Sequence, residues 1–126
     1  MKKILVVDDS PNWVKYHESA LLLIFGDNVI IDKAYSAREA NDKITASVDE
    51  PYDIIFTDMQ METDFLPFYA GEWFIKQIQL FKEYKATKVV IISATSNIRQ
   101  ISENTMLILF RNICAKALKL IKKFWM

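Results

Sequence analysis

Three short apolar runs in this sequence each end in an acidic or hydroxyl side chain. The runs and the side chains that follow them are residues 4–7 with Asp8 and Asp9, residues 54–57 with Asp58, and residues 89–92 with Ser93. If the runs are parallel strands of one open α/β sheet, their carboxyl ends meet in a single crevice. Mg²⁺ takes oxygen ligands in octahedral geometry and usually one or two carboxylates from the protein. The spacing therefore predicts a site for a hard divalent cation at Asp8, Asp9 and Asp58.

Each of these acids, taken alone, has a simpler interpretation. Most aspartates lie at the surface, often where a loop begins, and have no special role. For any single member of the set that interpretation is the better one. It loses its advantage when three acids stand at the ends of strand-like runs, and we therefore favour the shared site.

The apolar runs have the length and β-branched composition of strands that are buried on both faces. Ser10 and Pro11 form a typical helix start, with an N-cap residue before a proline at the first helical position. Ser36 and Glu39 have the spacing of a capping box, which predicts the start of a second helix. The expected strands are 4–7, 29–31, 52–57 and 88–92, and the expected helices run from residue 11 to Gly26, from Ser36 to about residue 47 and over 72–84. This alternation predicts βαβ units and a parallel sheet.

Two interpretations remain open for the last third of the chain. Apolar side chains recur at helical intervals from about Met106 onward, which is consistent with one unbroken helix. Alternatively, residues 113–115 form a fifth strand. The positions behind the helical interpretation are Leu107, Phe110, Cys114, Ala117 or Leu118, Ile121 and Trp125.

Composition narrows the class of protein. A chain of 126 residues with 52% hydrophobic side chains is expected to form one domain, residues 1–126, with a real core. Its formal net charge is zero, so we expect neither nucleic acid nor an anionic membrane surface as a direct partner. The single cysteine, Cys114, fits a buried apolar position in a reducing compartment, the cytoplasm. Residues 20–25, the longest apolar stretch, are far short of the roughly 18 needed to span a bilayer, and no signal peptide is expected.

Nearly the whole chain resembles a known family. The segments KILVVDDS at residues 3–10, YDIIFTDMQM at 52–61 and VVIISA at 89–94 look like the three main motifs of the receiver domain of bacterial two-component response regulators, of the CheY-like superfamily. The motifs occur in the family's order. The resemblance implies an α/β, flavodoxin-like, doubly wound sheet of five parallel strands in the order 2-1-3-4-5, with helices on both faces and the site at the carboxyl ends of the strands.

The resemblance also implies a role for each site residue. Asp58 would accept a phosphoryl group, Ser93 would be the switch hydroxyl that moves to contact it, and Lys116 would be the lysine that pairs with it. Phosphoryl transfer depends mainly on positioning and on neutralising charge, so a carboxylate nucleophile, a cation and a lysine form a sufficient set. The implied Mg²⁺ ligands are Asp8, Asp9, Asp58 and the backbone carbonyl of Gln60.

The sequence departs from the family pattern beside the acceptor. The family usually has proline four residues after the acceptor and glycine eight residues after it, but here Glu62 stands at the first position and Gly71 is the matching glycine. The glycine is expected at position 66, so about five residues are inserted. The enlarged segment, residues 62–70, is rich in aromatics. We expect it to fold over its own small hydrophobic cluster, and the alternative is a surface that docks a partner.

A second departure surrounds Lys116. The aromatic residue and the proline that usually flank the family lysine are both missing, which puts the usual coupling between hydroxyl and aromatic in doubt. If this region is a long helix, Lys116 is a solvated helix residue and Arg111 is the nearest substitute cation. Separately, His17 has no second histidine or cysteine nearby, so we expect a surface or boundary histidine and not a metal ligand.

We therefore expect a regulatory phosphoacceptor domain and not an enzyme in the ordinary sense. It would take a phosphoryl group onto Asp58 from a sensor histidine kinase or a phosphotransfer protein, with Mg²⁺, and present a changed surface to an output protein or domain. No output segment fits in 126 residues, so a stand-alone regulator or a fragment of a longer one is expected. The alternative is a degenerate receiver that docks partners without phosphorylation. A Mg²⁺-dependent phosphatase is disfavoured, because its motif separates the two aspartates by one residue and here they are adjacent.

Overall fold

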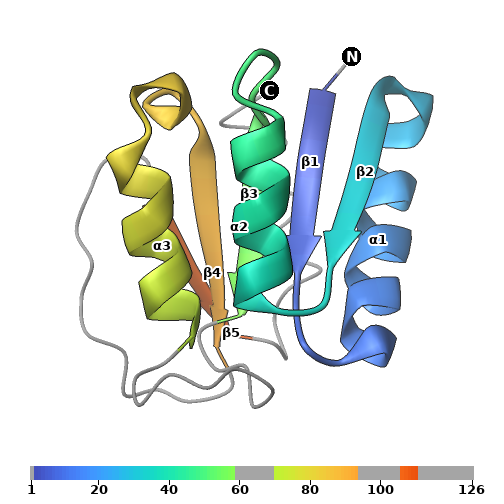
Figure 1. Cartoon of the computed structure of the whole chain (residues 1–126). Coiled ribbons are helices and arrows are strands. Elements are labelled where there is room, and N and C mark those ends of the chain that lie inside the picture. The colour runs from blue at the N-terminus through green and yellow to red at the C-terminus, as the bar shows by residue number, and fades with distance from the viewer. Residues whose placement is uncertain (1, 59–69, 94–105, 111–126) are drawn as a thin grey trace.

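The structure, a computed structural model, describes residues 2–58, 70–93 and 106–110. Within these residues, five parallel strands form one sheet in the order β2-β1-β3-β4-β5, which confirms the expected topology (Figure 1). The strands are β1 (Lys2–Val7), β2 (Val29–Ala34), β3 (Ile54–Asp58), β4 (Lys88–Ser93) and β5 (Met106–Phe110). The helices are α1 (Pro11–Phe25), α2 (Ala37–Ala46) and α3 (Ala70–Leu80), with short 3₁₀ turns at Gly26–Asn28 and Lys82–Tyr84.

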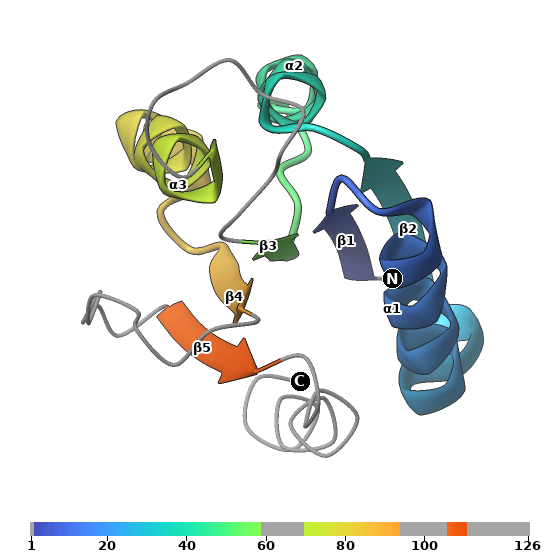
Figure 2. The same cartoon turned by 90° about the horizontal axis from the view of Figure 1, so that it is seen from below.

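The helices cover both faces of the sheet. Figure 2 shows α1 on one face and α2 and α3 together on the other. This arrangement follows from right-handed crossovers between parallel strands, which place the connecting helices on the faces of the sheet. Among the described helices, none is both long enough and apolar enough to cross a lipid bilayer.

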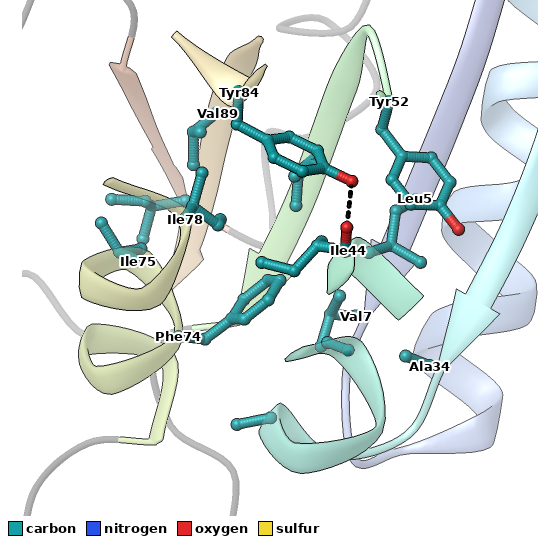
Figure 3. Packing of buried hydrophobic residues seen from close by; sticks show 14 residues of the cluster. Leu5, Val7, Ala34, Ile44, Tyr52, Phe74, Ile75, Ile78, Tyr84 and Val89 are labelled. Carbon is teal, nitrogen blue, oxygen red and sulfur yellow. Dashed lines mark hydrogen bonds between the residues drawn. The ribbon is translucent and has the colours of Figure 1, made fainter. Parts of the chain in front are cut away.

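Each face of the sheet carries its own hydrophobic cluster. Under α1, alternate strand side chains pack against one stripe of the helix; this cluster includes Ile4, Val6, Val14, Leu21, Phe25, Ile54 and Phe56. Under α2 and α3, the other side chains of the same strands are buried (Figure 3); this cluster includes Leu5, Val7, Ile44, Ile55, Phe74, Ile78, Tyr84 and Ile91. Strands β1, β3 and β4 are buried on both faces, which explains why they read as unbroken apolar runs.

Three hydroxyl groups tie the elements together at the amino ends of the strands. The Tyr84 hydroxyl donates to the Ile44 carbonyl at 2.7 Å, near the end of α2 (Figure 3). The Tyr52 hydroxyl donates to Asp32 Oδ2 at 2.7 Å, and Thr87 Oγ1 donates to the Tyr52 carbonyl at 2.7 Å. We call these three bonds the tyrosine network. Burial raises the pKa of Tyr52 to about 12, and burial also raises the pKa of Tyr84 above its ordinary value.

Strand β2 is longer than expected. The sequence predicted an end at residue 31, but the strand continues through the charged residues Asp32 and Lys33 to Ala34. Both charges have partners on neighbouring elements. Asp32 accepts from Tyr52, and Lys33 Nζ lies 3.1 Å from Glu18 Oε2 on α1. Strand residues can carry charge at a sheet edge when such partners exist.

The last described strand corrects one of the two open interpretations. Residues Met106–Phe110 pair with β4 as strand β5, so a helix that begins at Met106 is wrong for these residues. The alternative strand, residues 113–115, lies outside the described residues. The run MLILF is continuously apolar, and a short run of this kind has no period that separates helix from strand. Helix α3, which was expected over residues 72–84, ends earlier than predicted, at Leu80. Residues Lys82–Tyr84 form a 3₁₀ turn instead.

Candidate metal and phosphoryl site

The three acids predicted from strand ends lie together. Carboxylate oxygens of Asp8, Asp9 and Asp58 all come within 4.8 Å of one another. Asp8 is 1% exposed and Asp58 is 3% exposed, whereas Asp9 is half-buried. The register of the sheet brings them together, since Val7 at the end of β1 pairs with Thr57, the residue before Asp58.

Asp8 is held by both its backbone and its side chain. Its amide donates to the Ala34 carbonyl at 3.1 Å, which continues the pairing of β1 with β2 by one residue. Its Oδ1 accepts from the Ser10 amide at 3.0 Å. A bond from an aspartate to the amide two residues later is an Asx-turn, which reverses the chain after the strand. The same turn that ends β1 therefore orients a carboxylate of the cluster.

Helix α1 begins at this turn, as the sequence predicted. Ser10 has extended backbone angles, and its Oγ accepts from the Trp13 amide at 3.4 Å. Pro11 occupies the first helical position, where its missing N–H costs nothing. The positive end of the helix dipole thus lies next to the acid pair in sequence, an arrangement that favours negative charge.

Helix α2 begins at the same edge of the sheet and has a modified capping box. Ser36 Oγ accepts from the Glu39 amide at 3.0 Å, as expected. The returning bond differs, because Glu39 Oε2 accepts from the amide of Tyr35 at 3.3 Å and not from that of Ser36. The box is therefore shifted by one residue on its return side, while the predicted helix start is correct.

The donor set fits a hard divalent cation. Three carboxylates supply oxygen ligands of the kind that Mg²⁺ prefers, and the remaining octahedral positions are usually filled by water. Two of the three carboxylates are almost fully buried. Like charges in a desolvated cluster disfavour one another, and a bound cation removes that penalty. The cluster is thus suited to hold Mg²⁺ and to place Asp58 beside it.

The other predicted site residues are placed in part. Ser93 is the last residue of β4, and its neighbour Ile92 pairs with Asp58, so Ser93 belongs to the same edge of the sheet. Gln60 and Lys116 lie outside the described residues, as do the inserted segment 62–69 and Cys114.

His17 is not the surface or boundary residue that the sequence suggested. It is 1% exposed, its ring stacks on Trp13 with centroids 5.8 Å apart, and it meets Tyr16 edge-on at 5.5 Å. Helical spacing could have revealed this, because His17 lies three residues after Val14 and four before Leu21, both core residues. The positions of all three predict one buried stripe.

Sequence reasoning also missed the contribution of the Ser10 amide. Ser10 was recognised only as a helix cap, although a residue two positions after an aspartate is where an Asx-turn places its donor. The signal was therefore present in the spacing of Asp8 and Ser10.

Comparisons with known proteins agree with this geometry. No family model matches the chain, and no curated protein sequence matches it. Solved structures do match. The signal receiver domain of a DNA-binding response regulator from Colwellia psychrerythraea is 16% identical, with a TM-score of 0.70 over 98% of this chain and 99% of that one. The bacteriophytochrome response regulator AtBRR is also 16% identical, with a TM-score of 0.69 over 100% of this chain and 96% of that one.

The same fold occurs in a receiver domain that belongs to a kinase. The receiver domain of a histidine kinase from Arabidopsis thaliana is 17% identical, with a TM-score of 0.64 over 97% of this chain and 89% of that one. The chain therefore has the flavodoxin-like fold of a response regulator receiver domain. Its acidic cluster lies at the carboxyl edge of that fold, where parallel α/β sheets bind their ligands.

Proposed function

We propose that the chain is a phospho-accepting receiver domain that works in the cytoplasm. It takes a phosphoryl group onto Asp58, with Mg²⁺, from a sensor histidine kinase or a phosphotransfer protein, and its changed surface then acts on an output protein or domain. The observation that carries this proposal is the convergence of three carboxylates within 4.8 Å at the carboxyl edge of a receiver fold. It is a regulatory domain, and the acceptor is part of its own chain.

Asp58 is the proposed nucleophile because it ends the central strand β3 and is held almost entirely out of water. One of its oxygens forms the new bond to phosphorus as the bond from phosphorus to the donor breaks, and the donor keeps that electron pair. Asp8 and Asp9 would hold Mg²⁺ together with Asp58 and the Gln60 carbonyl. The ion would neutralise charge on the phosphoryl oxygens. Ser93 would then contact the new phosphoryl group from the neighbouring strand end.

Lys116 is the proposed cation that pairs with the phosphoryl group, and Arg111 is its competitor. Strand β5 ends at Phe110, which pairs with Ser93, so Arg111 is the next residue of the chain after a strand end at this edge. A cation that reads a phosphoryl group makes charge-assisted hydrogen bonds to its oxygens. Lys116→Ala should therefore reduce the rate of phosphoryl uptake from acetyl phosphate more than Arg111→Ala does. The reverse order would transfer the role to Arg111.

Labelling by a small phosphodonor tests the proposal directly. Incubation with acetyl phosphate and Mg²⁺ should add one phosphoryl group to the wild-type chain, and chelation of Mg²⁺ should prevent it. Asp58→Asn should take up none. The matched control is Asp49→Asn, which removes an exposed acid and should label like wild type. Label on Asp8 or Asp9 in the Asp58→Asn variant would refute the assignment of the nucleophile.

The second candidate is a degenerate receiver that docks a partner without phosphorylation. It is favoured by the aromatic insertion at residues 62–70 and by the loss of the residues that usually flank the family lysine. This candidate predicts a folded chain that no phosphodonor labels at any Mg²⁺ concentration. The labelling experiment therefore separates the two functions.

A further inference from the structure

Ser10 lies between the acidic cluster and helix α1 and makes a hydrogen bond to each. Its amide donates to Asp8 Oδ1 at 3.0 Å, and its Oγ accepts from the Trp13 amide at 3.4 Å. Its carbonyl accepts from the Val14 amide at 3.0 Å, the first bond of the helix. One residue thus fixes both the direction of the Asp8 carboxylate and the position at which the helix begins.

Two of its three hydrogen-bond partners, Asp8 and Val14, are in protected positions. Asp8 is 1% exposed and Val14 is 1% exposed, so water cannot easily replace the bonds that Ser10 makes to them. Ser10 is itself half-buried. A hydrogen bond to an ionised carboxylate is stronger than a neutral one and restricts the carboxylate to one orientation. Groups that hold metal ligands in this manner commonly tune the affinity of the ion.

We infer that Ser10 is a positioning residue that couples the first turn of α1 to the metal site. Ordering that turn orients Asp8, and a cation on Asp8 in return stabilises the turn, because a coupling between two equilibria is reciprocal. This inference rests on the proposed Mg²⁺ site. It adds that occupancy of the site is sensed by α1, through an amide and a hydroxyl of the same residue.

The chain contains a matched control for this coupling. Ser36 begins α2 in the same way, with Oγ accepting from the Glu39 amide at 3.0 Å and its carbonyl accepting from the Ala40 amide at 3.0 Å. Ser36→Ala and Ser10→Ala therefore each remove one helix cap of the same kind. Only the Ser10 change loosens a residue whose amide holds Asp8.

Metal affinity is measured with Mn²⁺ by electron paramagnetic resonance and with Mg²⁺ by calorimetry, on the full chain without phosphodonor. Ser10→Ala keeps the amide that bonds Asp8 and removes the cap that fixes its position. Both affinities should therefore fall roughly fivefold, which is less than the about 10–100-fold typical when a group bonded to a metal ligand is itself lost. Ser36→Ala should leave both affinities at the wild-type value. Ser10→Thr keeps the hydroxyl and should restore most of the affinity.

Amide hydrogen exchange provides a second readout that does not require a variant. Saturating Mg²⁺ should slow exchange at the Ser10 and Trp13 amides of the wild-type chain and leave the Glu39 amide unchanged. Equal loss of affinity in Ser10→Ala and Ser36→Ala, or unchanged exchange at Ser10 and Trp13, would overturn the inference. If the wild-type chain binds neither ion, the proposed Mg²⁺ site fails as well, and the two failures are thereby distinguished.

Discussion

Asp8 and Asp58 are acidic side chains from which the fold almost entirely excludes water. Buried carboxylates that face one another are costly to stability unless a cation or hydrogen-bond donors compensate them. The Ser10 amide compensates Asp8 in part. At the level of single residues, repulsion within the cluster therefore lowers the stability of the metal-free chain and raises its affinity for a cation.

Asp58→Asn should make the metal-free protein more stable. Removing one negative charge from the cluster should raise the free energy of unfolding by about 1 kcal/mol in a buffer containing a chelator. Urea denaturation with and without Mg²⁺ measures this, and Mg²⁺ should stabilise the wild type but not the variant. The control Asp49→Asn should stay within about 0.5 kcal/mol of wild type. Destabilisation by Asp58→Asn in the chelator would contradict the prediction.

The two buried tyrosines predict a loss of stability at high pH. Burial raises the pKa of Tyr52 to about 12 from an ordinary value near 10. A group whose pKa is raised in the folded state contributes its full stability below the unfolded pKa and loses it as the pH rises through the folded pKa. The free energy of unfolding should therefore fall between about pH 10 and pH 12. The free energy of unfolding of the Tyr52→Phe variant should fall less over this range. Lysines titrate in both proteins, so the difference between the variant and the wild type reports the tyrosine alone.

The elements themselves were largely predictable, and for identifiable reasons. Ser10 with Pro11 and Ser36 with Glu39 gave the two helix starts correctly, because capping depends on local chemistry alone. The continuation of β2 was not predictable, since its charged residues depend on Tyr52 and Glu18, which are distant in sequence. Strand β5 was missed for the same reason, because it is defined by pairing with β4 and not by its own pattern.

The candidate site was predictable to the same extent. Strand ends can be read from apolar runs, so Asp8, Asp9 and Asp58 were found without knowledge of the fold. The burial of His17 could have been predicted only by extending the apolar stripe of α1 through a polar residue, since His17 lies between Val14 and Leu21 at helical spacing. The bond from the Ser10 amide to Asp8 depends on backbone geometry after the strand, which residue types only suggest.

Tyr84→Phe tests how firmly α2 is attached to the sheet. The change removes the hydroxyl that donates to the Ile44 carbonyl, which still accepts from the Ser47 amide at 3.3 Å. One intramolecular hydrogen bond contributes roughly 0.5–1.5 kcal/mol net, so the free energy of unfolding should fall by about that amount. Chemical denaturation measures it, and Tyr35→Phe, at an exposed tyrosine, is the control. An unchanged midpoint for Tyr84→Phe would show that the bond has no net effect on stability.

At the scale of the whole molecule, the two edges of the sheet have different contents. The carboxyl edge holds the acidic cluster and the starts of α1 and α2. The amino edge holds the tyrosine network, in which Tyr84 is bonded to α2 and Tyr52 is bonded to β2. Substitutions in the acidic cluster should therefore leave the hydrogen bonds of the tyrosine network intact.

Mg²⁺ binding should be visible from a tryptophan in α1. The Trp13 amide donates a hydrogen bond to Ser10 Oγ, and Trp13 lies four residues after Asp9 in the sequence. In a Trp73→Phe, Trp125→Phe background, Mg²⁺ should change the fluorescence of Trp13 in a saturable manner. Asp9→Ala should weaken the apparent affinity by about tenfold or more, since a direct ligand is lost. The same affinity in Asp9→Ala as in the parent would exclude Asp9 from the site.

The register between β1 and β3 makes the site sensitive to the length of a strand. Val7 pairs with Thr57, and each residue of a strand advances the chain by about 3.3 Å while turning successive side chains to opposite faces. A single deletion inside β3 would therefore move residue 58 back along the sheet and direct its carboxylate toward the face covered by α2 and α3. Divergence in this protein should accordingly tolerate changes of chain length outside the strands and forbid them within the four residues before Asp58.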